Sequence, residues 1–432
     1  MKKVWFSVVP MLLILIFWIV HATSELPLMP DGVYDFPSLH LVSELDPFDV
    51  ERKLWHNARA SVRGTTESYL FENVKVQLRG RGNSSWVRGP EKRPLRLRFE
   101  EPRALLDSGH KARDWVLIAN HFDMALVRNH AAFYLSELLD GIDWTPFSRL
   151  VHLYINNDYA GVYQVADERD IGPGRINLNY HPDPALSEYL FEIDGSVTTW
   201  IEEKGGVENV DFFAVDERAF DIRFPKRKYW NGHLEYLRDF TLNVDAVIRS
   251  HDYEAIKSVI DIPSFIDFYL IQEFFKEIDI RFPSRSVFLQ VRGQGSNRKM
   301  YFGPVWDFDR SAGNTLYWTE PRHIFAGHYF DWFREMLEIP EMVDLIIERW
   351  NEIKYNEIEE MIRYVAYLTF HYKEAFERNF ERHDHIFGGE PAWFVMLPEA
   401  TTSIDTFRGQ ADYLLDWFDG RVMWLDNYFN RR

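Results

Sequence analysis

Apolar and polar residues alternate with the period of a β-strand in two neighbouring stretches of the chain. Successive side chains of a strand point to opposite faces of its sheet. The apolar positions of these two stretches are Val74, Val76, Leu78, Leu95, Leu97 and Phe99. Basic and amide residues stand between them, and the turn-forming sequence "GRGNSS" (80–85) separates the two stretches. The pattern therefore predicts a hairpin with one apolar face and one basic face.

The same kind of alternation predicts two further hairpins. One hairpin is "RLVHLYINNDYAGVYQVADE" (149–168), in which "NND" forms the turn. The other joins "SVFLQVR" (286–292) to "KMYFGPV" (299–305) through "GQGSN". Short apolar runs predict single strands at 115–119 and 188–194.

Other segments carry the spacing of helices. We expect helices at 124–139, at about 232–260 and at 261–279. Asp261 and Pro263 are typical of the first turn of the last of these helices. The final hundred residues are rich in Trp, Phe and Glu at helical spacing, so they predict a helical lobe.

The chain begins with a basic pair followed by an uncharged run. Lys2 and Lys3 precede seventeen residues without a charge, from Val4 to Val20. The run is long for a cleaved signal and short for a membrane span. Residues 1–22 are therefore either a signal peptide or an N-terminal signal anchor. Both alternatives predict that the rest of the chain is extracytoplasmic, either exported or membrane-anchored.

Composition narrows the classes of function. The 432 residues are 46% hydrophobic, which is enough for a large core, and the length predicts either two or three domains or one large domain with subdomains. The formal net charge of −18 makes the surface as a whole repel nucleic acids and anionic membranes, so no nucleic-acid partner is expected. The absence of cysteine excludes disulfides, zinc–thiolate sites and thiol chemistry.

Positive charge is concentrated in the first predicted hairpin. Residues 79–98 contain seven Arg and Lys residues and a single acid, Glu91. This segment is either a solvated basic strand face that pairs with acids elsewhere, or an anion site. In an anion site, guanidinium groups and a glycine-bearing turn contact phosphate oxygens. The "NSS" at 83–85 is also a glycosylation sequon, which has a meaning only in a eukaryotic secretory pathway.

Acidic residues end two of the predicted elements. In "GPVWDFDR" (303–310), Asp307 and Asp309 lie on one face of an extended chain. Asp279 ends the buried helix that precedes this hairpin. Protein kinases place a catalytic acid, a strand pair and a metal-binding acid in the same order. Phosphoryl transfer needs one carboxylate to orient the attacking hydroxyl and another to hold Mg²⁺ against the nucleotide phosphates.

Six sequence blocks in this order support a family resemblance. They are "RGRGNSSW", "KRPLRLRF", "DWVLIANHFDMALVRN", "GVYQVADE", "FYLIQEFFKEID" and "YFGPVWDFD". The chain resembles the CotH kinase family, the spore-coat-associated atypical protein kinases, from about residue 37 to the C-terminus. The resemblance implies an α+β, two-lobed atypical protein-kinase-like fold, with antiparallel β-hairpins in the N-lobe and a largely helical C-lobe. The implied division is an N-terminal arm at 23–66, an N-lobe at 67–170, a catalytic C-lobe at 171–330 and a helical part at 331–432.

The resemblance also implies a reaction. It is the transfer of the ATP γ-phosphate to Ser or Thr of exported or spore-coat proteins, with Mg²⁺ or Mn²⁺. Asp279 of "KEID" would be the catalytic acid, Asp307 of "WDFD" the metal-binding acid, and Asp309 a second metal ligand. Family members can carry an Asn shortly after the catalytic acid. Here Ser284 and Ser286 stand in that place. Ser284 would offer a second metal ion only a hydroxyl ligand, so the chain departs from the family pattern at this metal site.

Several basic residues are rival candidates for contact with the phosphates. They are Arg81, Lys92, Arg93, Arg96, Arg98 and Arg128. Strand alternation puts Arg96 and Arg98 on one face, so these two can act together. Glu168, after the "GVYQV" strand, corresponds in position to the nucleotide hinge of kinases. There its backbone would matter more than its carboxylate.

Two other classes of function stay open. The first is a non-catalytic scaffold or surface protein that keeps the kinase shape in coat or envelope assembly, because ATP is scarce outside the cytoplasm. The second is a glycosyltransferase, because "DFD" is also a DxD pattern, although that fold needs alternating βα units where hairpins are predicted. The expected partners are ATP and a Ser/Thr-containing acceptor protein of the spore coat or cell surface. N-terminal membrane association remains an alternative.

Overall fold

The computed structural model describes most of the chain after residue 35. The described residues are 36–44, 50–82, 85–86, 92–196, 212–281, 287–316, 318–383 and 398–431. The predicted signal segment at 1–22, together with Ser284 and Ser286, lies outside them. Among the helices of the described ranges, none is both long and apolar enough to cross a membrane.

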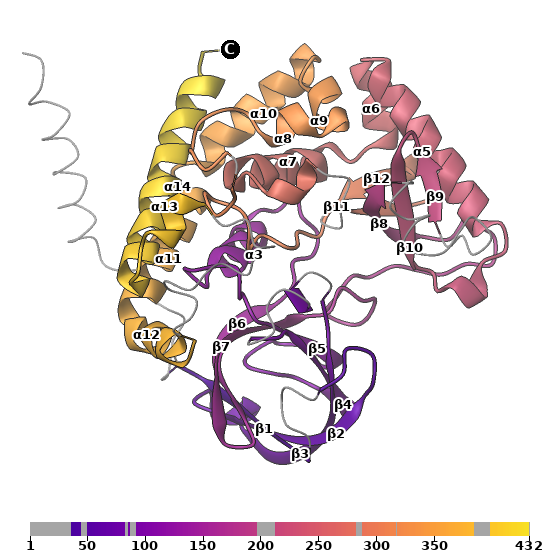
Figure 1. Cartoon of the computed structure of the whole chain (residues 1–432). Coiled ribbons are helices and arrows are strands. Elements are labelled where there is room, and N and C mark those ends of the chain that lie inside the picture. The colour runs from indigo at the N-terminus through magenta and orange to yellow at the C-terminus, as the bar shows by residue number, and fades with distance from the viewer. Residues whose placement is uncertain are drawn as a thin grey trace, which may run out of the picture. The chain divides into compact units, whose positions relative to one another are not determined.

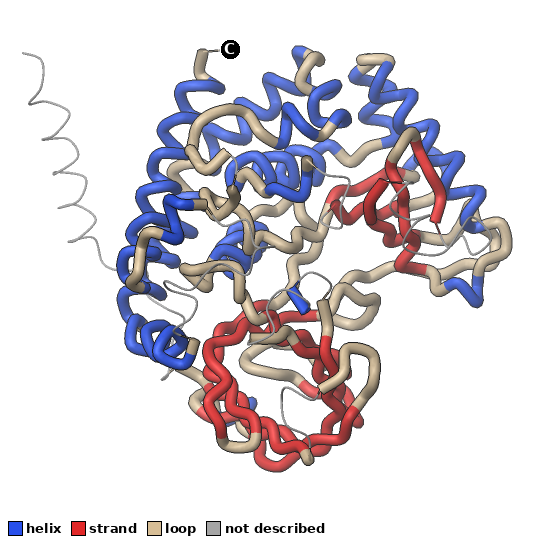
Figure 2. Tube along the Cα trace, viewed as in Figure 1, coloured by secondary structure: helices blue, strands red, loops and turns tan. Residues whose placement is uncertain are grey.

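The first part of the described chain forms a closed β-barrel (Figures 1 and 2). Its strands, in order around the barrel, are β1 (Ser38–Ser43), β2 (His56–Arg63), β3 (Phe71–Gly80), β4 (Leu95–Arg103), β5 (Ala112–Ile118), β7 (Asp158–Asp167) and β6 (Ser148–Ile155). Neighbouring strands are antiparallel except β1 and β6, which pair in parallel and close the barrel. Closure leaves the barrel without an unpaired sheet edge.

The barrel forms because alternate residues of its strands are apolar. Leu78 of β3 lies opposite Leu97 of β4, which lies opposite Trp115 of β5, and all three are fully buried in the interior. The β6–β7 hairpin turns at Asn156 and Asn157, both with positive φ, a conformation that asparagine adopts more readily than most residues.

A second sheet and the helices share the larger core. This sheet has the order β12 (Lys299–Phe302), β11 (Val287–Arg292), β8 (Tyr189–Ser196), β10 (Arg218–Phe224) and β9 (Phe212–Val215). The helices are α3 (Arg128–Leu138), α5 (His233–Arg249), α6 (Tyr253–Val259), α7 (Ile262–Phe275), α8 (Ala326–Tyr329), α9 (Asp331–Met336), α10 (Pro340–Ile353), α11 (Glu357–His371), α12 (Lys373–Arg382), α13 (Glu399–Thr402) and α14 (Phe407–Phe429). Helix α7 is buried along nearly its whole length, and Asp261 caps it by accepting a hydrogen bond from the Ser264 N–H at 3.0 Å.

Two helices attach the barrel to this larger core. Helix α3 packs on β6, and α12 packs on β7. The Val162 N–H donates to Asn379 Oδ1 at 2.9 Å, and Arg382 Nε donates to the Tyr159 carbonyl at 2.9 Å. These bonds fix the side of the barrel that carries β7 against α12.

The mixed α+β class agrees with the sequence prediction, but the arrangement of its parts differs. The predicted hairpins are present as β3–β4, β6–β7 and β11–β12, yet the first two belong to a closed barrel rather than to an open lobe of hairpins. The segment that we expected to be an arm contributes strands β1 and β2. Both strands are amphipathic, and they complete the barrel. The part that we expected to be largely helical also contains the second sheet. The described chain is therefore not plainly the two-lobed kinase arrangement that the sequence suggested.

Two predicted helix ends are also wrong, for backbone reasons. Helix α3 begins at Arg128 rather than at residue 124, because Leu126 has a φ of 62° and the preceding residues form turns. Helix α7 ends at Phe275 rather than at Asp279, because Lys276 adopts the left-handed conformation. Asp279 therefore lies in a short 3₁₀ turn, Ile278–Ile280, after the helix.

Candidate functional site

The "WDFD" segment follows β12 and is anchored by its two aromatic residues. Trp306 and Phe308 are buried, and the Phe308 ring meets the Phe275 ring of α7 at a centroid distance of 5.3 Å. Asp307 and Asp309 are partly exposed, as the alternation predicts. Asp307 has a φ of 71°, which is uncommon outside glycine and costs on the order of 1–3 kcal/mol. Backbone strain of this kind is concentrated at functional sites.

Side chains from α3 hold this segment in place. The Phe308 N–H donates to Asn129 Oδ1 at 2.6 Å. The Arg128 guanidinium donates to the Ala312 carbonyl at 3.2 and 3.3 Å and to Asp123 Oδ1 at 2.5 Å. Arg128 has no exposed surface, so it acts as a positioning group between α3 and the loop after "WDFD". All of its guanidinium contacts given by the structure are to protein groups, and its contact with phosphate stays a prediction.

Asp279 is positioned by the end of α7. Glu277 is fully buried, and its carboxylate accepts hydrogen bonds from the Asp279 N–H at 2.8 Å and the Ile280 N–H at 3.0 Å. The ammonium of Lys276 donates to carbonyls of residues 318, 320 and 322 at 2.7–3.0 Å, which ties the turn to that segment. The side chain of Asp279 is partly exposed at the surface of this rigid turn.

The acidic residues of these separate segments converge electrostatically on Asp309. Burial raises the pKa of Asp309 well above its usual range, and the charges of Asp307, Asp279 and Asp123 raise it further. Arg310 acts in the opposite direction but does not offset the others. Within the described residues, Asp307 makes no ion pair, so the alternative of a structural Asp307–Arg310 pair is not found. Within the described residues, Arg128 pairs with Asp123 and Arg310 acts on Asp309, yet the pKa of Asp309 stays raised, so negative charge still predominates around it.

Arginines from the barrel lie next to this segment. The Arg81 and Arg169 guanidiniums lie over the Trp306 ring at 5.6 and 4.2 Å from its centroid. Glu168 is in contact with Arg96 at 3.3 Å. Burial alone would raise the pKa of Glu168, but Arg96, Arg169 and other guanidiniums lower it, so its carboxylate is charged. The Glu168 side chain thus forms an ion pair with Arg96, whereas the sequence suggested that its backbone would matter more.

Lys92 is buried near the acidic cluster, and within the described residues its ammonium has no hydrogen-bond partner. Its exposed fraction is 1%, and Nζ lies 5.2 Å from the Tyr163 ring centroid. Its stem passes over Gly161, where an added Cβ would come within 3.2 Å of Lys92 Cε. Burial lowers the pKa of Lys92 to about 7, and the charge of Asp123 opposes this shift. A buried ammonium without an acceptor is the kind of group that an anionic ligand satisfies.

The remaining predicted basic residues contact side chains on or beside the barrel strands. Arg98 pairs with Asp114 at 2.7 Å, and Arg96 contacts the same carboxylate at 3.5 Å, so the two share a strand face. The Arg93 guanidinium lies over the Trp86 ring at 4.8 Å from its centroid. The structure therefore brings Arg81, Arg96 and Lys92 toward the site, whereas Arg98 pairs with Asp114 along the barrel.

Three residues with clear roles were not found from the sequence. Asp123 belongs to the acidic cluster, Arg169 covers Trp306, and Asn129 holds the Phe308 backbone. The signal for Asp123 and Asn129 was their place in the "HFDMALVRN" block, which looked like a helix start. Arg169 follows Glu168 directly, but one sequence gives no indication that its side chain turns toward residue 306.

A second acidic group lies away from these residues. Oxygen atoms of Asp216, Asp245 and Asp331 all fall within 4.8 Å of one another. Arg218 and Arg249 each contact all three carboxylates at 2.8–3.8 Å. Because two guanidiniums each contact all three acids and leave only one net negative charge, the contacts describe an ion-pair network rather than an open metal site. Upstream of "DFD", β11 pairs antiparallel with both β8 and β12, so the parallel βα units of a sugar-nucleotide fold are not found among the described strands.

Kinase-like proteins use carboxylates from separate loops together with nearby cations. This structure has carboxylates from two loops, at the strained "WDFD" segment and beside cations of the barrel. The comparison with protein families gives the same class. The chain belongs to the family described as CotH kinase protein, whose model matches residues 78–425. This membership suggests a kinase-like or coat-related function. A comparison with curated proteins finds no match for this chain.

Proposed function

We propose that this protein is a metal-dependent kinase that transfers the γ-phosphate of ATP to Ser or Thr hydroxyls of an acceptor protein. The observation that carries the proposal is the convergence of Asp279, Asp307 and Asp123 on Asp309, with Lys92 buried nearby and without a hydrogen-bond partner in the described chain. In the described part of the chain, burial and neighbouring carboxylates raise the pKa of Asp309, and the Lys92 ammonium, which is close enough to Asp123 to feel its charge, has no hydrogen-bond partner. A cation bound with a polyphosphate satisfies both.

Asp279 is the group that orients the acceptor. It is partly exposed, and buried Glu277 fixes its backbone, so its carboxylate can accept the hydroxyl proton as the phosphate is transferred. Its place after α7, before the β11–β12 hairpin that leads to "WDFD", corresponds to the order of the kinase catalytic and metal-binding acids.

Asp307 and Asp309 fit a divalent cation because they offer hard carboxylate oxygens, and no ion pair to either is found among the described residues. Mg²⁺ or Mn²⁺ would neutralise charge that develops on the phosphate oxygens. Lys92, Arg81 and Arg96 are the cations that can hold the nucleotide phosphates from the barrel side. Of these, Lys92 has the best support, because Arg96 is already paired with Glu168 and Arg81 lies over Trp306.

The test is transfer of labelled phosphate from ATP, with Mg²⁺ or Mn²⁺, to the protein itself and to a Ser/Thr-rich acceptor. We expect Asp279→Asn to abolish transfer while it preserves the nucleotide-dependent rise in Tm. Asp239→Asn, an exposed substitution of the same kind, is the matched control and should keep full activity. Transfer that survives in Asp279→Asn would contradict the catalytic assignment.

The same assay decides between a kinase and a scaffold. A wild-type protein that shows a Mg-ATP-dependent rise in Tm but no transfer to any acceptor would support the non-catalytic alternative. Transfer of a sugar from a sugar nucleotide would instead favour the glycosyltransferase. We further propose that the protein acts outside the cytoplasm, held there or exported by residues 1–22, on a coat or surface protein. Mass spectrometry of the mature N-terminus in the native cell would show whether those residues are removed.

A further inference from the structure

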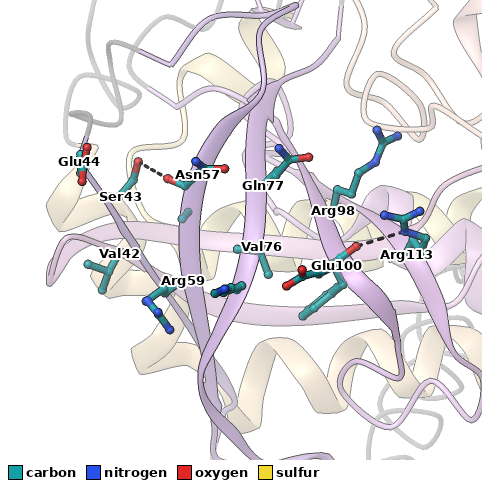
Figure 3. Close-up of a pocket in the computed structure, with 13 residues that line it drawn as sticks. Val42, Ser43, Glu44, Asn57, Arg59, Val76, Gln77, Arg98, Glu100 and Arg113 are labelled. Carbon is teal, nitrogen blue, oxygen red and sulfur yellow. Dashed lines mark hydrogen bonds between the residues drawn. The ribbon is translucent and has the colours of Figure 1, made fainter.

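A groove runs across the outer face of the barrel, perpendicular to its strands (Figure 3). Its volume is about 760 Å³. Its floor is formed by strand positions that pair in register, Ser43, Ala58, Val76 and Phe99. Because side chains alternate along a strand, the residues before and after each floor position point outward and form two walls.

The walls are polar and carry more positive than negative charge. One wall contains Glu44, Asn57, Gln77 and Arg98, and the other contains Val42, Arg59, Lys75 and Glu100, with Arg113 at the end. Among the described residues, no carboxylate lies within ion-pair distance of Arg59, Lys75 or Arg113. Arg59 donates to the Asn73 carbonyl at 2.7 Å, which leaves its charge uncompensated.

Like charges are crowded at the side of the groove toward the candidate site. Arg79 lies directly opposite Arg96 in the β3–β4 pair, an arrangement that is destabilising in an antiparallel sheet. The Trp55 ring lies under both Arg79 and Arg98, at 4.9 and 4.3 Å from its centroid. Arg79 Nε is buried and has no hydrogen-bond partner in the described chain. Asp114 and Glu168 pair with Arg98 and Arg96, whereas no carboxylate of the described chain lies within ion-pair distance of Arg79.

Arg79, Arg96 and Arg98, here called the arginine row, continue toward the predicted phosphate site. Arg96 contacts Glu168 at 3.3 Å, and next along the chain Arg169 lies over Trp306 of "WDFD". A strip of guanidiniums therefore leads from the groove to the acidic cluster. The chain as a whole carries a net charge of −18, so this face differs in sign from most of the molecule.

We propose that the groove and the arginine row bind an acidic, extended segment of the acceptor polypeptide and guide it toward the site. That the bound partner is the acceptor rests on the proposed function; the binding of an acidic polypeptide does not. Guanidinium groups match carboxylates bidentately, and Asn57 and Gln77 can hydrogen-bond a peptide main chain. One wall carries both amides and the opposite wall carries Arg59 and Lys75, a combination that suits a peptide better than a membrane surface or the regular phosphates of a nucleic acid.

The test is fluorescence anisotropy of a short fluorescein-labelled glutamate-rich peptide titrated with the full chain. We expect binding that weakens with salt, and a loss of about tenfold or more in affinity for the double variant Arg59→Glu, Lys75→Glu. Lys257→Glu with Lys373→Glu makes the same change of charge on exposed helix positions and should bind as the wild type does. Both pairs are outside the core, and a matched Tm for the two variants shows that folding is preserved.

Two further arms separate this proposal from the proposed function. Asp279→Asn should bind the peptide with unchanged affinity, because docking does not need chemistry. A protein that binds the peptide through the groove but transfers no phosphate would retain the docking surface and lose the kinase assignment. Equal binding of a glutamine-rich peptide, unchanged affinity in the groove variant, or binding of phosphatidylglycerol vesicles that the peptide fails to displace would each overturn the docking proposal.

Discussion

Replacing Lys92 by methionine is expected to have opposite effects on the free protein and on nucleotide binding. Burial lowers the pKa of Lys92 from 10.5 to about 7. Each unit of pKa difference corresponds to about 1.4 kcal/mol, so holding the buried ammonium costs about 5 kcal/mol at low pH and about 4 kcal/mol at pH 7. Methionine has a similar shape and no charge, so it removes this cost while it keeps contact with Tyr163.

The sign of the pH effect follows from the same shift. The folded pKa lies below the unfolded value, so between pH 7 and 10.5 the unfolded state binds one more proton. Stability of the wild type therefore rises with pH across that window, and Lys92→Met lacks this rise. At pH 7 and below, the free variant should be more stable than the wild type, with a Tm higher by several degrees.

The assay is differential scanning fluorimetry at several pH values, with and without Mg-ATP. Lys92→Met should raise the Tm of the free protein at pH 7 and lose most of the further rise that Mg-ATP produces. Lys257→Met, at an exposed position, is the control and should change neither value. A variant that is less stable when free and still gains a full Mg-ATP shift would show that Lys92 is a structural lysine, and the reasoning from its burial would fail.

Three further predictions concern the metal, the nucleotide and the positioning arginine. Asp307→Asn keeps a residue that tolerates a positive φ, so it should fold normally but lose the Tm rise caused by Mn²⁺ with ATP; an unchanged rise would remove Asp307 as a ligand. Phosphates beside Lys92 should restore its charge, so ATP binding should take up a proton above pH 7, which calorimetry in buffers of different ionisation enthalpy will measure; zero uptake places the phosphates elsewhere. Arg128→Met leaves Asp123 buried and unpaired and should lower the free energy of unfolding by about 3–5 kcal/mol in urea titrations, whereas a loss below 1 kcal/mol would contradict its positioning role.

The sequence predicted local elements well because their periodicity is strong. The β3–β4, β6–β7 and β11–β12 hairpins are confirmed, as are the long buried helix after Asp261 and the family resemblance. Each depends on residues close in the chain. Barrel closure was missed because it depends on the pairing of β1 with β6, which are more than a hundred residues apart and carry no signal in one sequence.

The sequence singles out the candidate acids of the site more clearly than its candidate cations. Asp279, Asp307 and Asp309 stand out because carboxylates that end apolar runs are unusual, and their spacing follows the family order. The cations are ambiguous because "KRPLRLR" offers several in a few residues, and strand alternation does not tell which face meets the larger core. Burial separates them: Lys92 is enclosed near Asp123, while Arg98 stays on the outer face of the barrel.

A buried polar chain explains how the barrel and the helices keep the "WDFD" segment in one position. From the Phe308 N–H, successive hydrogen bonds of 2.6–3.0 Å connect Asn129, Asn120, Gln164, Ser148, His130 and Tyr364. Burial lowers the pKa of His130 to about 3, so the ring stays neutral at physiological pH and the chain of bonds does not change with protonation. Because α3, β7, β6 and α11 each contribute a member, a shift of the barrel against the helices breaks a buried bond, which costs roughly 1–3 kcal/mol per unsatisfied group. The site's acids and the barrel's cations are therefore held in a fixed relation by groups that take no part in binding.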